Sequence, residues 1–489
     1  MTFPFLGLTI FIPLLAGLLI LLLPARFKNW VRGIALGAAT LTLLLSIIIY
    51  ARYDTAAGGY QFIEHLPWVP ALGISYYVGV DGISAPLVLL AGIVIFCGVL
   101  VSWKVEERIH EFFAFLLFLG TSVLGVFASL DLFQLFFFFE LAVFPKYLMI
   151  VIWGSPKTRE YGGMKLTLYL FLGSVIALVG ALALYFGSGL QTFDMLELEK
   201  AGFATEFQRL WFPFVFLGFG ILGGIFPFHS WAPDGHVAAP TAISMLLAGV
   251  EMKVGVFSAL RVGIMLLPEG AQLWSPLILA LGTINVVYGA FIALIQTDFK
   301  YVIGFSSVSH MGLVLIGMAT LSKEGLLGAG MQMFSHGVMT ALFFAVVGMV
   351  YDRAHTREIG QLGGLFKKMP WAALGFIVGG LVSMGMPGFS GFVAEYPIFM
   401  GAWRTAPWVA VIAVLGILIT AAYILLVVRR VFFGNLPETL AAVEDVSWRD
   451  KLVIGLLSIT MIALGWFPAL MTPLLEQGVN YILKLVGGA

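Results

Sequence analysis

Charge and cysteine are both scarce in this sequence of 489 residues. Only 11% of the residues are Asp, Glu, Lys or Arg, and their formal net charge is zero, so no charge excess points to nucleic acid or to an acidic partner. The single cysteine, Cys97, cannot form an internal disulfide, a CxxC motif or a ligand set for an iron–sulfur cluster. Any redox cofactor is therefore expected in a partner protein.

Motifs of the common soluble enzymes are missing as well. No GxGxxG follows a strand, and the chain contains no GxxxxGK[ST], HExxH or GxSxG motif. Four of the seven histidines lie in two separated pairs without cysteine or clustered carboxylates beside them, which makes a weak ligand set for a metal ion. We therefore expect neither a cofactor nor a metal ion in this chain.

Long hydrophobic runs dominate instead. Hydrophobic residues make up 61% of the chain, whose mean hydropathy is +1.03, and this composition excludes a soluble protein. We predict an all-α polytopic membrane protein in the lipid bilayer. A spanning helix needs about 20 apolar residues, and the sequence offers fourteen such runs. They are 3–24, 30–50, 81–102, 110–128, 131–153, 165–187, 211–228, 241–266, 275–297, 300–320, 327–350, 371–393, 408–428 and 452–474.

The loops between these runs carry unequal positive charge. By the positive-inside rule, the loops richer in lysine and arginine are cytoplasmic, so both termini are expected on the outer side of a bacterial-type inner (plasma) membrane. The first run lacks the features of a cleaved signal and is expected to stay as the first span. The richer group includes Arg26, Lys104, Lys157, Lys300 and Arg357, and the poorer one Arg52, Lys200 and Arg261.

Two of the runs are interrupted in a similar way, the seventh by Gly223–Pro227 and the twelfth by Gly385–Gly388. Irregular backbone at membrane depth is tolerated only inside protein or against a water-filled cavity, and paired breaks are typical of transporters with inverted repeats. Simple packing kinks are the alternative. We expect one membrane domain, 1–489, with N-terminal helices in 1–109, two inverted five-helix repeats in 110–266 and 275–433, and a last helix with its tail in 452–489.

Several ionisable residues fall inside the apolar runs, where a charge costs about 2.5–3.5 kcal/mol to insert. Proton relays are built from such Glu, Lys and His series, because a buried group can change protonation when a neighbouring charge moves. The alternative for each residue is a static ion pair, a snorkelling side chain, as for Lys165 near a helix end, or a capping interaction, as for His229. The candidates are Glu140, Lys146, Lys165, His229, Glu251, Lys253, His310, His336 and Glu395.

Five motifs, in this order and spacing, resemble the proton-antiporter-like subunits of complex I, the NADH:quinone oxidoreductase. The resemblance spans nearly the whole chain. Two features resemble the M type of subunit. The twelfth helix carries Glu395, where the longest such subunit typically has lysine, and the chain lacks a long C-terminal lateral helix. The motifs are Gly79–Ser84, Phe226–His236, Leu246–Lys253, Asp298–Met311 and Met386–Glu395.

This resemblance implies a fold of fourteen helices with a central hydrophilic axis. It also implies that other membrane-arm subunits of complex I are partners, and that FMN, iron–sulfur clusters and quinone lie in partner subunits whose redox reaction drives proton transfer here. By resemblance, Glu140 gates coupling to the neighbouring subunit, Lys253 is the eighth-helix lysine, His310 and His336 bridge the relay, and Glu395 is the group on the exit side.

The chain departs from this family in the seventh helix. The family's lysine there, the usual partner of the fifth-helix glutamate, would fall at Leu222. We predict that Lys146 takes over the missing cationic role. Six residues correspond to about 600° of helix, so Glu140 and Lys146 do not pair directly unless the helix kinks, for which Pro145 is placed. The alternatives are that Lys146 snorkels or forms a static pair with Glu251.

Two other functions remain open at this point. A large subunit of a multi-subunit Na+/H+ antiporter shares this fold and much of the motif set. A pore or scaffold with static buried charges is a third possibility, although it explains the two broken helices poorly.

Overall fold

Apolar runs become helices at each of the fourteen expected places in the computed structural model, which describes residues 3–24 and 26–487. The first half of the chain contains α1 (Phe5–Leu22), α2 (Lys28–Arg52), α3 (Ser84–Val101), α4 (Ile109–Ala128), α5 (Leu132–Leu141), α6 (Val143–Trp153), α7 (Arg159–Ser188), α8 (Met195–Lys200), α9 (Thr205–Leu222) and α10 (Trp231–Ala238). The second half contains α11 (Thr241–Leu246), α12 (Met252–Ser258), α13 (Pro268–Ile295), α14 (Phe299–Ala319), α15 (Lys323–Ala354), α16 (Pro370–Ser383), α17 (Ser390–Thr405), α18 (Pro407–Val427), α19 (Trp448–Trp466) and α20 (Thr472–Leu485).

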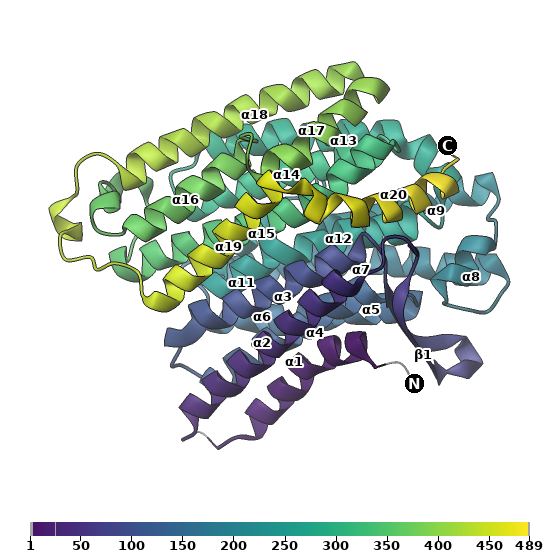
Figure 1. The fold of residues 1–489 in the computed structure, drawn as a ribbon, viewed down its shortest axis with the longest axis horizontal. Helices are drawn as coiled ribbons and strands as arrows, with labels where there is room; N and C mark the ends of the chain where they lie inside the picture. Colours follow the sequence, from purple (N-terminus) through teal and green to yellow (C-terminus); the bar gives the residue numbers. More distant parts are fainter. Residues whose placement is uncertain (1–2, 25, 488–489) are drawn as a thin grey trace.

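Eleven helical stretches of the described chain are long and apolar enough to cross a membrane. This confirms the expected all-α polytopic fold. The other three expected spans are the two interrupted ones, α9 with α10 and α16 with α17, and the more polar α19. The N-terminal helices lie at one edge of the bundle and α18 at the opposite edge (Figure 1).

The bundle centre is formed by the eighth, tenth and eleventh spans. Their most apolar windows are 100%, 94% and 100% buried, whereas those of α1 and α18 are only one-third buried. The central spans carry Lys253, His310 and His336, so these ionisable groups lie far from lipid. A buried charge needs a partner or water at such a place.

Both interruptions predicted from glycine and proline are present. Helix α9 ends at Leu222 and α10 begins at Trp231, with Gly224 at φ +77° between them. Helix α16 ends at Ser383 and α17 begins at Ser390, with Gly385 at φ +61°. Left-handed backbone of this kind is readily adopted only by glycine.

Two further spans are irregular; Pro145 marks a kink in the fifth, whereas the sequence gives no signal for the eighth. The fifth span breaks at Ala142, between α5 and α6, three residues before Pro145. The eighth contains two π-helical segments, η3 (Leu247–Glu251) and η4 (Ala259–Ile264), one on each side of α12. π-Helical turns are rare and frequently occur at functional sites.

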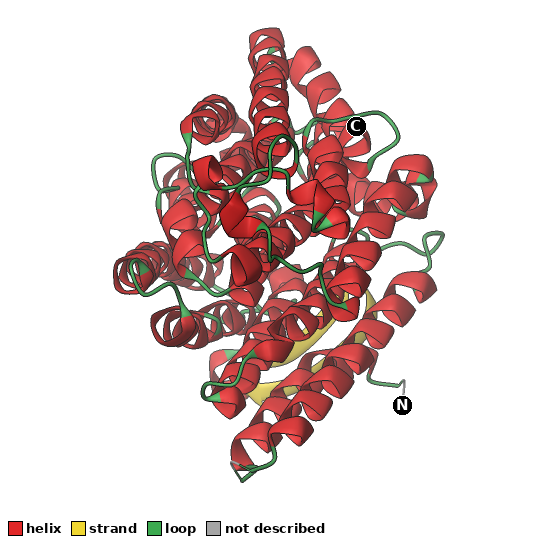
Figure 2. Cartoon of the chain, turned by 90° about the vertical axis from the view of Figure 1, so that its left-hand side faces the viewer, coloured by secondary structure: helices red, strands yellow, loops and turns green. Residues whose placement is uncertain are grey.

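A β-hairpin between α2 and α3 was not predicted. Strand β1 (Gln61–Val69) pairs with the antiparallel strand β2 (Ile74–Val80), and both lie near the N-terminal edge of the molecule (Figure 2). The backbone of β2 donates hydrogen bonds to the side chains of Asp131 and Gln134 at the start of α5. A search for runs of about 20 apolar residues passes over strands this short.

Candidate functional site

Four of the predicted residues form one continuous buried line at the centre of the bundle. Lys253 Nζ lies 2.7 Å from His336 Nδ1. The His336 ring stacks on the His310 ring, with centroids 5.3 Å apart and planes 15° apart. His310 Nε2 lies 3.8 Å from Glu395 Oε1. We refer to Lys253, His336, His310 and Glu395 as the central line, which joins α12, α15, α14 and α17.

Glycines bring the helices of Lys253 and His336 together. A Cβ on Gly337 would lie 2.6 Å from the Gly249 carbonyl oxygen, and one on Gly249 would lie 3.1 Å from the Gly337 carbonyl oxygen. The backbones of η3 and α15 therefore meet without side chains between them. The Lys253 ammonium also donates a hydrogen bond to the Ala248 carbonyl within η3.

His310 faces a backbone carbonyl oxygen at each ring nitrogen. Nδ1 lies 2.8 Å from the Ser306 oxygen and Nε2 lies 3.2 Å from the Ser383 oxygen. A neutral imidazole carries one N–H, so it can satisfy one of these acceptors, whereas an imidazolium satisfies both. The Tyr423 hydroxyl donates a 2.8 Å hydrogen bond to the Ser306 hydroxyl beside this ring. This geometry lets His310 exist in both protonation states.

Glu395 occupies room made by the break in the twelfth span. Its side chain is 2% exposed, and Oε2 has no hydrogen-bond partner within the described chain. Gln332 Nε2 lies 3.5 Å from Oε1. A Cβ on Gly385 would lie 2.6 Å from Oε2, so a glycine at the break leaves the space that the carboxyl group fills.

Lys146 and Glu251 form a second buried site. Their ion pair joins α6 to η3, with side chains 1% and 2% exposed. Lys146 therefore does not snorkel to the membrane surface. Leu222, where the resemblance predicts a lysine, and Glu251 line the same small cavity, so the Lys146 ammonium reaches a carboxylate next to that position.

Glu140 lies apart from that pair, on a more exposed part of the bundle. The residue is partly buried, and its Oε1 is buried without a hydrogen-bond partner in the described chain. The carboxyl group lies near Ser174 and within electrostatic range of Lys146. Among the residues that the structure describes, Glu140 and Lys146 form no ion pair, in agreement with the helix geometry. The break at Ala142 lies between them.

Lys165 and His229 have other neighbours. Lys165 Nζ lies 2.6 Å from Asp234 Oδ2, and the Tyr301 hydroxyl donates a 2.8 Å hydrogen bond to the other carboxylate oxygen. The His229 ring stacks on Phe226 and meets Tyr288 edge-on. No hydrogen bond or ion pair within 3–24 and 26–487 joins either residue to the central line.

Sequence reasoning placed two basic residues wrongly. Lys300 was expected in a cytoplasmic loop, but it is 4% exposed in the first turn of α14 and its Nζ donates a 2.6 Å hydrogen bond to the Ala239 carbonyl. Arg261 was expected in an outer loop, but it lies in η4, buried in an ion pair with Asp81. The sequence does contain a signal that Lys300 is helical: Asp298 is a residue type that caps helix N-termini, and here it caps α14, so Lys300 lies inside the helix.

His236 is a further buried histidine, on α10. It is 0% exposed, and neither ring nitrogen has a hydrogen-bond partner in the described residues. In those same residues, no group of three or more His, Cys, Asp or Glu side chains is placed to hold a metal ion. The chemistry that the arrangement supports is movement of protons between neighbouring amine, imidazole and carboxyl groups.

Comparison with known proteins gives consistent relatives. The profile of the NADH:quinone oxidoreductase/Mrp antiporter transmembrane family matches residues 129–420. NADH-quinone oxidoreductase subunit M of Rhodobacter capsulatus is 38% identical over 473 residues, which cover 94% of this chain and 92% of that protein.

Two solved structures have the same fold. A chain of respiratory complex I from Thermus thermophilus with bound NADH superposes with a TM-score of 0.90 at 30% identity, covering 99% of this chain and all of that one. A chain of the Mrp complex from Dietzia sp. superposes with a TM-score of 0.87, and both chains are covered completely. Because the second is only 20% identical, it shows a common fold alone.

Proposed function

The chain belongs to the NADH:quinone oxidoreductase/Mrp antiporter transmembrane family, and from that premise we propose that it moves protons as a membrane-arm subunit of a complex I-type enzyme. Its similarity to complex I subunits in Rhodobacter capsulatus and Thermus thermophilus confirms the expected resemblance. The Na+/H+ antiporter alternative is less supported, because the Mrp chain is much less similar in sequence.

The observation that carries the proposal is the central line. Amine, imidazole, imidazole and carboxyl follow one another at close range across four helices. Each group can bind or release a proton, and the two central rings are buried where lipid cannot reach them. Protons pass from Lys253 through His336 and His310 to Glu395, which delivers them toward the exit.

Glu140, Lys146 and Glu251 form the coupling half of this pathway. Glu140 is partly exposed and faces the neighbouring subunit. A change in the protonation of Glu140 changes the protonation of Lys146. Lys146 replaces the seventh-helix lysine by reaching Glu251 from α6. Lys165 and His229 act at the margin of this half, where Lys165 binds Asp234.

The two halves correspond to inverted repeats, residues 110–266 and 275–433, each containing one span broken by glycine and proline. N-terminal helices in 1–109 and the last helix with its tail in 452–489 flank them in a single membrane domain. The two breaks, at Gly223–Pro227 and Gly385–Gly388, lie at matching positions in the second half of each repeat.

The chain works inside a larger assembly. Other membrane-arm subunits are its partners, and FMN, iron–sulfur clusters and quinone lie in partner subunits rather than here. The membrane is a bacterial-type inner membrane with both termini on its outer side.

Purification through a tag on this chain tests the proposal. We expect flavin and iron–sulfur subunits to be recovered with it, together with inhibitor-sensitive quinone reduction that acidifies or alkalinises sealed vesicles. Recovery with small membrane subunits alone, without redox centres, would move the assignment to the Na+/H+ antiporters.

A further inference from the structure

Asn285 of α13 is a fully buried amide side chain outside both the central line and the coupling half. Its Oδ1 accepts a 2.7 Å hydrogen bond from the backbone N–H of Phe226, and its Nδ2 donates a 2.8 Å hydrogen bond to the backbone carbonyl of Gly224. Both backbone groups belong to the break between α9 and α10, where the regular helical ladder stops. An unpaired backbone group at this depth would be costly. The amide of Asn285 therefore closes the break in place of a helix backbone.

On one side of this break, α9 is packed directly on α12, the helix of Lys253. A Cβ on Gly255, two residues after Lys253, would lie 2.4 Å from the backbone nitrogen of Gly223. It would also lie 2.8 Å from the carbonyl oxygen of Phe219 in α9. The two backbones meet without a side chain between them, and protein interiors packed this closely transmit displacement. Helices α9 and α12 thus form a pair that carries Lys253.

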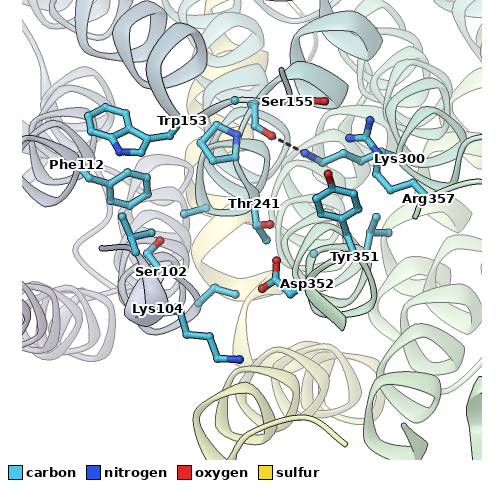
Figure 3. Close-up of a pocket in the computed structure, with 18 of the residues that line it drawn as sticks. Ser102, Lys104, Phe112, Trp153, Ser155, Thr241, Lys300, Tyr351, Asp352 and Arg357 are labelled. Carbon is cyan, nitrogen blue, oxygen red and sulfur yellow. Dashed lines mark hydrogen bonds between the residues drawn. The ribbon is translucent and has the colours of Figure 1, made fainter. Parts of the chain in front are cut away.

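On the other side of the break, α10 is packed on α14, the helix of His310. A Cβ on Gly304 of α14 would lie 2.9 Å from Pro233 Cα in α10. Lys300, labelled in the close-up of Figure 3, donates its 2.6 Å hydrogen bond to the carbonyl of Ala239, the residue that follows α10. Helices α10 and α14 thus form a second pair, which carries His310.

Asn285 lies where the chain passes from the first helix pair to the second. Its Nδ2 also donates a 3.3 Å hydrogen bond to the backbone carbonyl of Val308, two residues before His310. We propose that Asn285 is a positioning residue for proton transfer: by fixing the break, it holds the helix of His310 in place relative to the helix of Lys253. The inference rests on the proposed function and adds a residue that sets the spacing of the central line without carrying a proton.

The second break is lined by a different kind of side chain. His310 Nε2 lies 3.2 Å from the carbonyl oxygen of Ser383, and Glu395 fills the space beside Gly385. Both side chains can gain and lose a proton, whereas the amide of Asn285 carries no charge in either role as donor or acceptor. The first break is therefore held by a group of constant charge, so the spacing that Asn285 sets is the same before and after a proton passes.

Asn285→Leu tests this role, because it keeps a similar volume and removes all three hydrogen bonds. In assembled complexes reconstituted in sealed vesicles, we expect the maximal rate of proton transfer to fall severalfold while the KM for quinone stays unchanged. The matched control is Thr283→Val, two residues earlier on the same helix. Thr283 is also buried, but its hydroxyl donates to the Leu279 carbonyl within α13. This control should transfer protons at the parent rate.

Asn285→Asp separates positioning from packing. A neutral aspartic acid can accept from Phe226 and donate to Gly224, whereas an aspartate can only accept. Compared with the parent at each pH, its rate should approach the parent rate at low pH and fall as the new carboxyl group ionises. A parent rate in Asn285→Leu would overturn the inference, and so would an Asn285→Asp rate as low as that of Asn285→Leu at every pH. Lys253→Met distinguishes the two claims, because a parent rate in that variant would show that the proposed function itself is wrong.

Discussion

Lys146 of α6 and Glu251 of η3 form an ion pair that is almost completely removed from solvent. Breaking a buried pair by removing one partner leaves an uncompensated charge and costs about 3–5 kcal/mol. Leu222 lines the cavity against the same carboxylate. The pair thus lies beside Leu222, the position where the resemblance to complex I subunits predicts a lysine, and its cation is supplied from α6.

Lys146→Met should lower coupled proton pumping by about a hundredfold, the lower end of the range for loss of a positioned proton-transfer group. Leu222→Lys in the same chain should restore part of the loss, because its amine can reach Glu251 from α9. Proton uptake by vesicles per quinone reduced is the measurement, and Lys157→Met, in an exposed loop, is the control. Unchanged pumping in Lys146→Met would show that the pair is static.

Gly385→Ala should displace the carboxyl group of Glu395 while leaving that residue itself unchanged. The new Cβ would lie 2.6 Å from Glu395 Oε2 on a left-handed backbone, so the carboxyl group has to leave its present position, in which Oε1 lies 3.8 Å from His310 Nε2. The left-handed conformation alone costs about 1–2 kcal/mol for a residue with a Cβ. We expect pumping to fall severalfold in complexes that still assemble. The control is Gly360→Ala, since nothing lies within 4 Å of a Cβ there.

Glu395→Gln keeps the shape and the neighbour Gln332 but removes the ability to carry a proton. Pumping should fall by about tenfold or more, as for loss of a proton-transfer group. Glu395→Asp retains a carboxyl group further from His310, so its rate of proton pumping should lie between those of the parent and of Glu395→Gln. A Gln variant as active as the parent would place the exit elsewhere.

Asp81→Asn tests a structural pair outside the central line. The substitution leaves the Arg261 guanidinium buried in η4 without its carboxylate, and removal of one partner of such a pair costs about 3–5 kcal/mol. We expect a lower thermal denaturation midpoint and poorer assembly. Glu476→Gln, which removes the partner of the exposed Lys323, should change the midpoint little, because exposed pairs are screened by water. Equal midpoints for the two variants would contradict the burial argument.

The spans, both glycine-containing breaks and the residues of the central line could be predicted from the sequence. Hydropathy over about 20 residues is a strong signal, and the cost of a buried charge singles out Lys253, His310, His336 and Glu395 wherever they fall. Their order along the chain did not show that Lys253 contacts His336 and that His310 contacts Glu395. Those contacts depend on which helices pack together, as at Gly249 and Gly337.

Boundaries and local irregularities were the harder part. The apolar run begins at Lys300 and so predicts a loop charge there, whereas α14 begins one residue earlier and the Lys300 side chain is buried. The π-helical segment that turns Glu251 toward Lys146 leaves no mark in the apolar pattern. The hairpin of β1 and β2 is short and contains Pro67, so neither length nor periodicity revealed it.

Lys253→Met tests the central claim most directly, since this residue begins the central line. The complex is purified, reconstituted in sealed vesicles, and assayed for proton transfer during quinone reduction, with Lys367→Met as the control. We predict that the control pumps normally and that Lys253→Met, with all subunits present, loses about 90% or more of its proton transfer. Normal pumping in assembled Lys253→Met complexes would contradict a proton path through the central line.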